Sequence, residues 1–237
     1  MMDQHEPSRT EIWKMFDQIS PTYDRLNKLL SFGLDSYWRH AVKAQLPYGD
    51  DLDLLDVATG TGDQTLSLIK TGRIRQAVGI DMSQEMLNLF ARKVKEHLLS
   101  HKVQLEKASA LAIPFADSTF DVVTISFGIR NVTDLKQALQ EMRRVLKPTG
   151  RLLILEFSQP SNPWLKRSHL FYLRHCLPRI AGLISQQKAA YTYLNRTIET
   201  FPYGQEFIDK MEEAGFVACT AHPLTFGVVS LYVGHPL

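Results

Sequence analysis

The sequence predicts an α/β domain built on an open, mostly parallel sheet, and three observations lead to this fold class. Short apolar runs rich in β-branched residues alternate with helical patterns between residues 51 and 157, which is typical of parallel strands joined by helices. The first of these runs leads into a glycine-rich turn at residues 60–62, as ligand-binding strands do in such sheets. The last two runs follow each other without a helix between them, which predicts a hairpin and one antiparallel strand.

The chain has 237 residues, the length of one large α/β domain with additions to its sheet. We expect a single domain, 1–237, in four parts. They are a helical N-terminal cap at 1–50, a ligand-binding core at 51–157, a helical insertion at 158–203, and a C-terminal helix with a hairpin at 204–237. Both helical additions are expected over the carboxyl ends of the strands, where ligands bind in open α/β sheets.

Seven strands are expected, at residues 52–58, 76–81, 103–107, 120–127, 151–157, 216–221 and 228–233. Between them, Ser83 is expected to cap a helix, because its hydroxyl can accept a backbone N–H and apolar residues follow it at helical spacing. A second helix is expected over 133–146, with a stop and a turn at Pro148-Thr149-Gly150. A third is expected at about 204–214.

The composition gives no indication of a nucleic-acid partner. The 27 basic and 25 acidic residues leave a formal charge of +2, whereas phosphate binding needs a concentrated basic surface. Cys176 and Cys219 are the two cysteines, and neither they nor the eight histidines show the spacing of a disulfide framework or a metal site. We therefore expect no metal and a reducing compartment. The sequence shows no signal-peptide pattern and no run of ~18 apolar residues, so a cytoplasmic protein is expected, able to touch the inner face of a membrane without crossing it.

The strongest chemical pattern is the turn Gly60-Thr61-Gly62, where missing side chains let the backbone approach a ligand. Asp56 ends the preceding strand, and its carboxylate can favour positive charges on a ligand. Asp81 ends the second strand, where a carboxylate accepts hydrogen bonds from both hydroxyls of a ribose. A dinucleotide fingerprint needs a third glycine where this sequence has Thr65. The alternative to a ligand-binding turn is a glycine turn that only makes a tight connection between the strand and the next helix.

Three further residues are candidates for contact with the same ligand. Ser109 and Ala110 come just after the third strand, where an adenine would be bracketed, and Ser126 comes at the carboxyl end of a buried strand. Each serine has an alternative role in satisfying backbone groups of a turn or strand end.

Several motifs resemble the quinone-biosynthesis C-methyltransferases, a family that methylates the ring carbon of demethylmenaquinol or of a 2-methoxy-6-polyprenyl-1,4-benzoquinol. The most specific is Ser126-Phe127-Gly128-Ile129-Arg130-Asn131-Val132. The resemblance covers nearly the whole chain and includes Met15-Phe16-Asp17, Tyr23-Asp24, Asn27, residues 30–34, Trp38-Arg39, 144–148, 155–158, Tyr193-Leu194, Phe201-Pro202 and 224–227. It departs from the family's pattern at Ser109, where an asparagine is expected, and in the last strand at 228–232.

The resemblance implies a class I S-adenosylmethionine-dependent methyltransferase with a Rossmann-like sheet of seven strands, the last of them antiparallel. It implies S-adenosylmethionine as co-substrate and a prenylated quinol as acceptor. Carried over residue by residue, it places cofactor contacts at Thr61, Asp81, Ser109 with Ala110, and Ser126.

Methyl transfer to a ring carbon requires that carbon to be held ~3–3.5 Å from the methyl group, opposite the sulfur. A hydroquinone carbon becomes nucleophilic when the neighbouring hydroxyl loses its proton, and a positive or hydrogen-bonding group must then stabilise the oxygen. Arg130 and Asn131 are the predicted catalytic residues. Arginine stays protonated and is a poor base, so a water, a carboxylate or a tyrosine is expected to take the proton. The alternative for Arg130 is an ion pair with an acid such as Glu156 that holds a loop.

Residues 160–200 combine apolar side chains with six basic residues and a single Glu, a pattern that suits an anionic membrane surface. The apolar residues are Trp164, Leu165, Leu170, Phe171, Tyr172, Leu173, Leu177, Ile180, Leu183 and Ile184. A lid or a homodimer interface is the alternative for this segment.

Three alternatives for the function stay open. The acceptor is expected to be demethylmenaquinol, with the benzoquinol of ubiquinone biosynthesis as the alternative, since both share these motifs. A methyltransferase for another small molecule, such as a sterol or a phenol, would share the cofactor motifs but lack Arg130-Asn131. A non-catalytic module would bind S-adenosylmethionine without transferring its methyl group.

Overall fold

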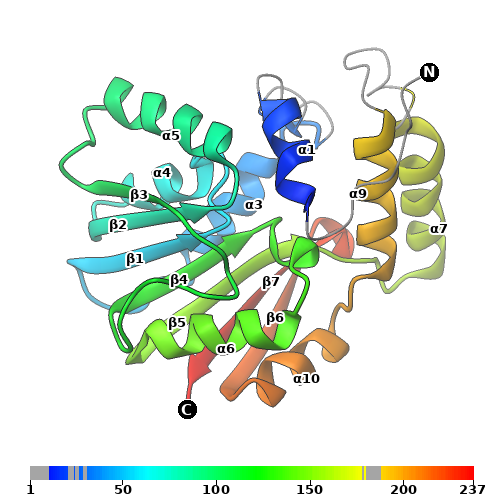
Figure 1. Ribbon diagram of the computed structural model, residues 1–237. Helices are drawn as coiled ribbons and strands as arrows, with labels where there is room; N and C mark the ends of the chain where they lie inside the picture. Colours follow the sequence, from blue (N-terminus) through cyan, green and yellow to red (C-terminus); the bar gives the residue numbers. More distant parts are fainter. Residues whose placement is uncertain (1–10, 21–23, 25–26, 29–30, 178, 180–187) are drawn as a thin grey trace.

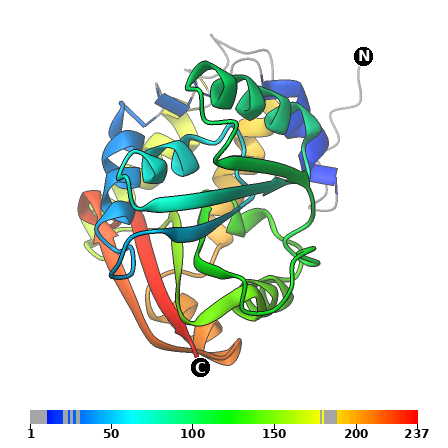
Figure 2. The ribbon, with the colours of Figure 1, turned by 90° about the vertical axis from the view of Figure 1, so that its left-hand side faces the viewer.

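The computed structural model describes residues 11–20, 24, 27–28, 31–177, 179 and 188–237. A seven-stranded sheet lies between two layers of helices (Figure 1, Figure 2). The strand order is β3-β2-β1-β4-β5-β7-β6, and β7 runs antiparallel to both β5 and β6. The predicted fold class is confirmed, including the antiparallel strand contributed by the terminal hairpin.

The strands match the prediction closely at most of their ends. They are β1 (Leu52–Val57), β2 (Ile74–Asp81), β3 (Val103–Lys107), β4 (Phe120–Ser126), β5 (Leu146–Phe157), β6 (Phe216–Leu224) and β7 (Val229–Pro236). The largest difference is at β5, which begins five residues before the predicted start at 151 because Leu146 pairs with Phe120. Pro148-Thr149-Gly150 fall in the irregular part of this strand, where the register shifts between the Leu146–Phe120 and Arg151–Val122 pairs. The preceding helix ends at Val145, and regular pairing begins at Arg151, where the strand was predicted to start.

The helices are α1 (Ile12–Ile19), α3 (Leu34–Lys43), α4 (Asp63–Ile69), α5 (Gln84–Glu96), α6 (Leu135–Val145), α7 (Pro163–Phe171), α9 (Lys188–Thr200) and α10 (Gln205–Glu213). Ser83 caps α5 as predicted, since its Oγ accepts the N–H of Met86 at 3.1 Å. The helix expected from residue 133 begins at Leu135, because the side chain of Asp134 accepts the N–H of Gln137 and caps it there.

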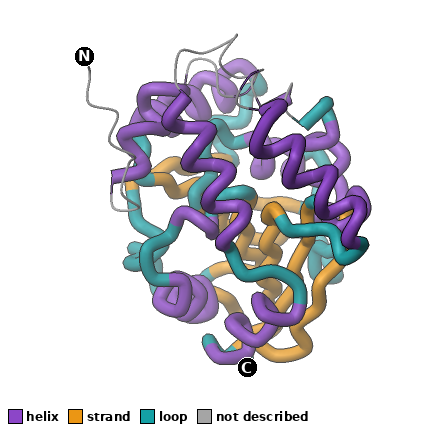
Figure 3. The backbone as a smooth tube through the Cα atoms, turned by 90° about the vertical axis from the view of Figure 1, so that its right-hand side faces the viewer, coloured by secondary structure: helices purple, strands orange, loops and turns teal. Residues whose placement is uncertain are grey.

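Two clusters of buried apolar side chains join the helices to the two faces of the sheet. One cluster contains α6 and α10 residues such as Leu139 and Phe207, and the other contains α3 and α4 residues such as Trp38 and Leu68. In the view onto the right-hand side of Figure 1, helices lie in front of one end of the sheet (Figure 3). The strands β1 and β4 are neighbours although they are far apart in the chain, which creates the crossover point where open α/β sheets bind ligands.

Gly62 allows α4 and α5 to pack closely at this end of the sheet. Its φ is +81°, and a Cβ atom there would lie 2.1 Å from the ring of the fully buried Phe90. Gly60 also has a positive φ, of +57°, but a Cβ added to it would meet no heavy atom within 4 Å. The two glycines of the turn therefore differ: Gly62 faces the packed core, and Gly60 faces open space.

We expect the Gly62→Ala substitution to lower the free energy of unfolding by about 2–5 kcal/mol, because the strain of a left-handed residue adds to overpacking against Phe90. Gly72→Ala is the matched control, since Gly72 has a φ of +78° and no heavy atom within 4 Å of the added Cβ. That control should lose only about 1–2 kcal/mol from backbone strain. Urea denaturation measures the free energy of unfolding of both variants. Equal losses of stability would show that contact with Phe90 does not restrict the residue at position 62.

Candidate functional site

The turn that follows β1 is held from beneath by Asp56. Its carboxylate accepts hydrogen bonds from the hydroxyls of Thr59, Thr65 and Thr124 at 2.8, 2.6 and 2.7 Å. Burial raises the pKa of Asp56, and these three hydrogen bonds act in the opposite direction. Only 1% of Asp56 is exposed, so the carboxylate supports the turn from within the core and does not face the cavity beside it. Thr65 belongs to this support, because its hydroxyl donates to Asp56. A glycine at this position would have no hydroxyl to donate.

A cavity of about 300 Å³ lies at the carboxyl ends of β1, β2 and β4. It is lined by five of the residues predicted to contact a cofactor, namely Gly60, Asp81, Ser109, Ala110 and Ser126. Thr61 does not line it. Its side chain is buried and its Oγ1 donates to Asp24 at 2.6 Å. The structure thus brings together residues from four separate segments of the chain around one space.

Asp81 connects the turn after β1 with the start of α5. One carboxylate oxygen accepts the N–H of Gly60 at 2.8 Å, and the other accepts the N–H of Ser83 at 2.9 Å. Burial raises the pKa of Asp81 to about 6. The carboxylate is therefore ionised at neutral pH, and it becomes protonated in mildly acidic solution.

The N-terminal cap covers the same cavity. Ile12, Trp13 and Phe16 of α1 contribute to its wall. Asp17 at the end of this helix accepts a hydrogen bond from Ser83 Oγ. Asp24 also pairs with Lys93 of α5 at 2.7 Å. Sequence patterns did not assign these residues to the cofactor site, because their partners lie more than 35 residues away in the chain.

The Asp81 carboxylate lines the cavity and suits the hydroxyl donors of S-adenosylmethionine. Ser126 also lines the cavity, and its hydroxyl donates to Gln64 Oε1 at 3.4 Å. Gln64 itself does not line the cavity, and its Nε2 is buried without a partner among the described residues. When bound here, S-adenosylmethionine supplies a methyl group on a positively charged sulfur.

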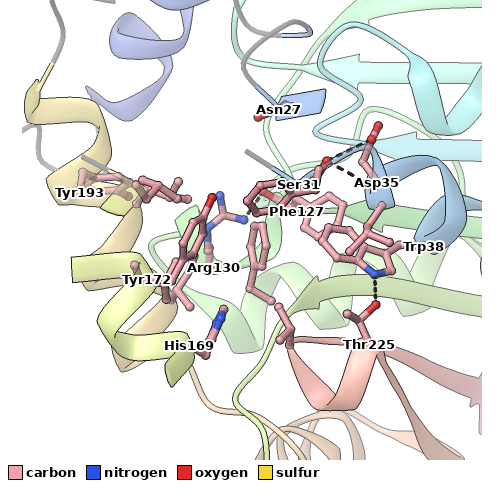
Figure 4. Close-up of a pocket in the computed structure, with 18 of the residues that line it drawn as sticks. Asn27, Ser31, Asp35, Trp38, Phe127, Arg130, His169, Tyr172, Tyr193 and Thr225 are labelled. Atoms are coloured by element: carbon pink, nitrogen blue, oxygen red, sulfur yellow. Dashed lines mark hydrogen bonds between the residues drawn. The ribbon is translucent and has the colours of Figure 1, made fainter. Parts of the chain in front are cut away.

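A second cavity, of about 270 Å³, adjoins the first. Its walls are mostly apolar and aromatic, and they come from α1, α3, the ends of β4 and β5, and residues within 169–177 and 193–198 (Figure 4). Phe127 lies 4.8 Å from Phe157 and 5.9 Å from Trp38, measured between ring centroids. The Nε1 of Trp38 donates to Thr225 Oγ1 at 2.7 Å and fixes this aromatic wall to the hairpin.

Arg130 and Asn131 form the polar end of the second cavity. They lie in the short helical turn η3 (Ile129–Asn131) that follows β4. Arg130 Nη1 forms an ion pair of 2.8 Å with Glu156 Oε1 and also donates to the carbonyl oxygen of Phe127. The Glu156 side chain is wholly buried, and burial raises its pKa although Arg130 opposes this. The predicted alternative for Arg130, an ion pair with Glu156, is thus present, and the same side chain also lines the cavity.

The two cavities meet at three residues: Phe16, Phe127 and Asn131 line both. Asn131 Oδ1 is buried without a partner among the described residues. Phe127 has a φ of +57°, a strained conformation for a bulky residue. The next residue is Gly128, and any larger residue there would clash, because its Cβ atom would lie 2.8 Å from the Cβ of Ala58. The ends of β1 and β4 therefore approach closely where the cavities join.

Other predictions for the site concern metals and membranes. Within the described ranges, no three His, Cys, Asp or Glu side chains are grouped to hold a metal ion, and the expected independence of metal stays a prediction. No described helix is long and apolar enough to span a bilayer. Of the apolar residues expected in the insertion, Ile180, Leu183 and Ile184 lie outside the described residues.

This sheet order, with a cavity at the β1 turn, is that of the S-adenosylmethionine-dependent methyltransferase fold. Solved structures share the fold. A SAM-dependent methyltransferase from Aquifex aeolicus superposes with a TM-score of 0.65 at 19% identity, covering 90% of this chain and 98% of that one. A SAM-dependent methyltransferase from Thermotoga maritima also gives a TM-score of 0.65, at 20% identity, covering 96% of this chain and 100% of that one.

The chain belongs to the ubiE/COQ5 methyltransferase family, whose profile matches residues 2–235. It is 47% identical over 220 residues to the ubiquinone/menaquinone biosynthesis C-methyltransferase UbiE of Syntrophotalea carbinolica, covering 93% of this chain and 92% of that protein. It is 42% identical over 230 residues to the demethylmenaquinone methyltransferase of Chlorobaculum parvum, covering 95% and 92%. The protein is therefore an S-adenosylmethionine-dependent C-methyltransferase, and the family predicted from the sequence is confirmed.

If Asp81 accepts the ribose hydroxyls, affinity for S-adenosylmethionine should depend on pH. The carboxylate is the acceptor, and its pKa is about 6, so the dissociation constant should be constant above about pH 7 and rise about tenfold per pH unit below 6. Asp81→Asn should bind more weakly at pH 7.5, without this dependence. Calorimetric titration from pH 5 to 8 measures the dissociation constant of each protein. Asp50→Asn is the control, because the Asp50 side chain is 81% exposed. Unchanged wild-type affinity between pH 5 and 7.5 would remove Asp81 from the site.

Proposed function

We propose that this protein methylates the ring carbon of demethylmenaquinol to form menaquinol, with S-adenosylmethionine as methyl donor. The observation that supports this most is the second cavity, an apolar and aromatic space with a polar end at Arg130 and Asn131 that opens onto the cofactor cavity. Ligand cavities that are mostly apolar with a few placed polar groups fit a prenylated aromatic ring. The benzoquinol of ubiquinone biosynthesis is the second candidate, because the relative in Syntrophotalea carbinolica is named for both pathways.

The chain's residues contribute placement and electrostatic stabilisation. Asn131 lines both cavities, so it can hold a ring hydroxyl next to the methyl group. Arg130, fixed by Glu156, keeps its positive charge at the same end of the cavity and stabilises the oxygen anion that forms when the hydroxyl loses its proton. Phe127 and Phe157 provide flat surfaces for the ring. Because the donor and acceptor cavities join at Asn131, holding the two reactants in line supplies much of the catalysis.

The assay that tests this function incubates the purified protein with labelled S-adenosylmethionine and each reduced quinol, and identifies the product by mass. We expect a single added methyl group on demethylmenaquinol. Saturable binding of S-adenosylmethionine without methylation of either quinol would instead favour a non-catalytic module, and methylation of only the benzoquinol would move the protein to ubiquinone biosynthesis.

In the same assay, Arg130→Ala should abolish turnover while affinity for S-adenosylmethionine persists. This change leaves Glu156 buried without its partner, at a cost of about 3–5 kcal/mol in stability. The double variant Arg130→Gln with Glu156→Gln avoids that cost, because two amides can hydrogen-bond in place of the ion pair. The double variant should fold and bind cofactor but turn over at least a hundredfold more slowly. Normal turnover in a folded double variant would rule out the electrostatic role of Arg130.

We further propose that α7 contacts an anionic membrane surface, from which the prenyl tail of the acceptor reaches the second cavity. None of the α7 residues is buried. The apolar side chains Trp164, Leu165 and Phe171 are 78%, 42% and 60% exposed. Basic residues accompany them, including Lys166 and Arg167 on the same helix. Exposed aromatic residues beside positive charges are typical of helices that bind at a lipid interface.

Vesicle flotation tests this contact. The wild-type protein should bind vesicles containing anionic lipid, release them at high salt, and bind neutral vesicles weakly. The double variant Trp164→Ser with Phe171→Ser should lose binding, whereas Leu98→Ser should keep it, since Leu98 is 81% exposed after α5. Equal binding by wild type and double variant would overturn the proposal. Conversion of a dimer to a monomer by the double variant would assign this surface to a homodimer.

A further inference from the structure

One polar group on the wall of the second cavity has no partner. His169 lies in the last turn of α7, and its Nε2 atom is buried without a hydrogen-bond partner among the described residues. The residue lines the same cavity as Arg130 and Asn131. In the close-up His169 lies at the lower edge of the cavity, on the side where Arg130 and Tyr172 also lie (Figure 4). A buried polar atom facing a ligand cavity indicates a polar group of the ligand as its partner.

The reaction needs a proton acceptor at this place, and most other polar side chains of the cavity are unsuited to it. Arg130 carries a guanidinium that stays protonated. Glu156 is wholly buried in its ion pair with Arg130 and does not line the cavity. Asp35 accepts a hydrogen bond from Ser31 Oγ at 3.2 Å and lies on the opposite wall, beside Trp38 (Figure 4). Burial raises the pKa of Tyr172, so its phenol stays protonated near neutral pH.

The surroundings of His169 favour its uncharged form. Burial lowers the pKa of His169 below its usual value of 6.5. The charged groups on the same cavity are Arg130, Arg39 and, on the far wall, Asp35. Lys166 and Arg167 are the other basic residues of its own helix. An uncharged imidazole has a lone pair that can accept a proton at neutral pH.

We propose that His169 is the general base of the reaction: its Nε2 takes the proton of the ring hydroxyl next to the carbon that is methylated, while Arg130 stabilises the oxygen anion. This inference rests on the function proposed above and names the proton acceptor of the same site. His169 would thus be a catalytic residue contributed by the helical insertion rather than by the strand ends.

The step balances with one proton released. The hydroxyl O–H bond breaks and its proton moves to Nε2, which leaves an imidazolium and a ring oxygen anion. The ring supplies the electron pair of the new carbon–carbon bond, and the carbon–sulfur bond breaks toward the sulfur, which becomes a neutral thioether. The methylated carbon then loses its hydrogen as a proton to water and the oxygen regains one from the imidazolium, which restores the aromatic quinol and the neutral histidine.

The test is the single-turnover rate of methylation between pH 5.5 and 8.5, with S-adenosylmethionine and reduced quinol both saturating. Saturation with cofactor separates this measurement from any titration of Asp81. In the wild type the rate should fall on the acid side, where the imidazole is protonated. His169→Gln should be slower by about a hundredfold to ten-thousandfold at pH 7.5, and its rate should lose the acid-side dependence. Cofactor affinity and the unfolding temperature of the variant should match the wild type.

His175→Gln is the matched control, since His175 is exposed in the next turn of helix and does not line the cavity. It should keep the wild-type rate and pH profile. His169→Asn replaces His169→Gln if the latter does not fold. A folded His169 variant with the wild-type rate, or with a reduced rate and an unchanged pH profile, would overturn the proposal while leaving the function intact. A wild-type protein that binds cofactor but methylates neither quinol would overturn the function instead.

Discussion

The ion pair between Arg130 and Glu156 holds η3, after β4, to β5 at the point where the two cavities meet. Two charges removed from water are costly unless each is paired and hydrogen-bonded, and here both partners are almost fully buried. Glu156 also accepts the backbone N–H of Phe157 at 2.8 Å, so the pair positions the aromatic wall as well as the guanidinium. The polar end of the second cavity therefore depends on this contact.

The neighbouring strands β1 and β4 lead into the two cavities. β1 ends at the supported turn beside the first cavity, and β4 ends next to Phe127 and Arg130, which line the second. The close approach of Ala58 and Gly128 brings these strand ends together. The helical additions contribute to both spaces: α1 supplies Phe16 to each, and His169, Tyr172 and Tyr193 line the second cavity. Both the strand ends and the helical additions therefore shape the two cavities.

Local features of the chain were predictable and long-range contacts were not. The turn at Gly60-Thr61-Gly62 and the cap at Ser83 follow from rules that span a few residues, and both were predicted at the right positions. The early start of β5 was not predicted, because it depends on the pairing of Leu146 with Phe120 across the sheet, ahead of the regular pairing that begins at Arg151. Gln64 and His169 gave no pattern of their own, since their importance comes from burial beside groups distant in sequence.

We propose that the acceptor ring occupies the cavity beside Arg130 and Asn131 while the methyl donor occupies the cavity beside Asp81. A crystal structure with S-adenosylhomocysteine and a reduced short-chain quinol would show both positions. We expect the thioether sulfur near the junction at Phe127, with a ring hydroxyl within hydrogen-bond distance of Asn131 or Arg130. A ring bound outside the second cavity, or a sulfur directed away from it, would contradict this arrangement.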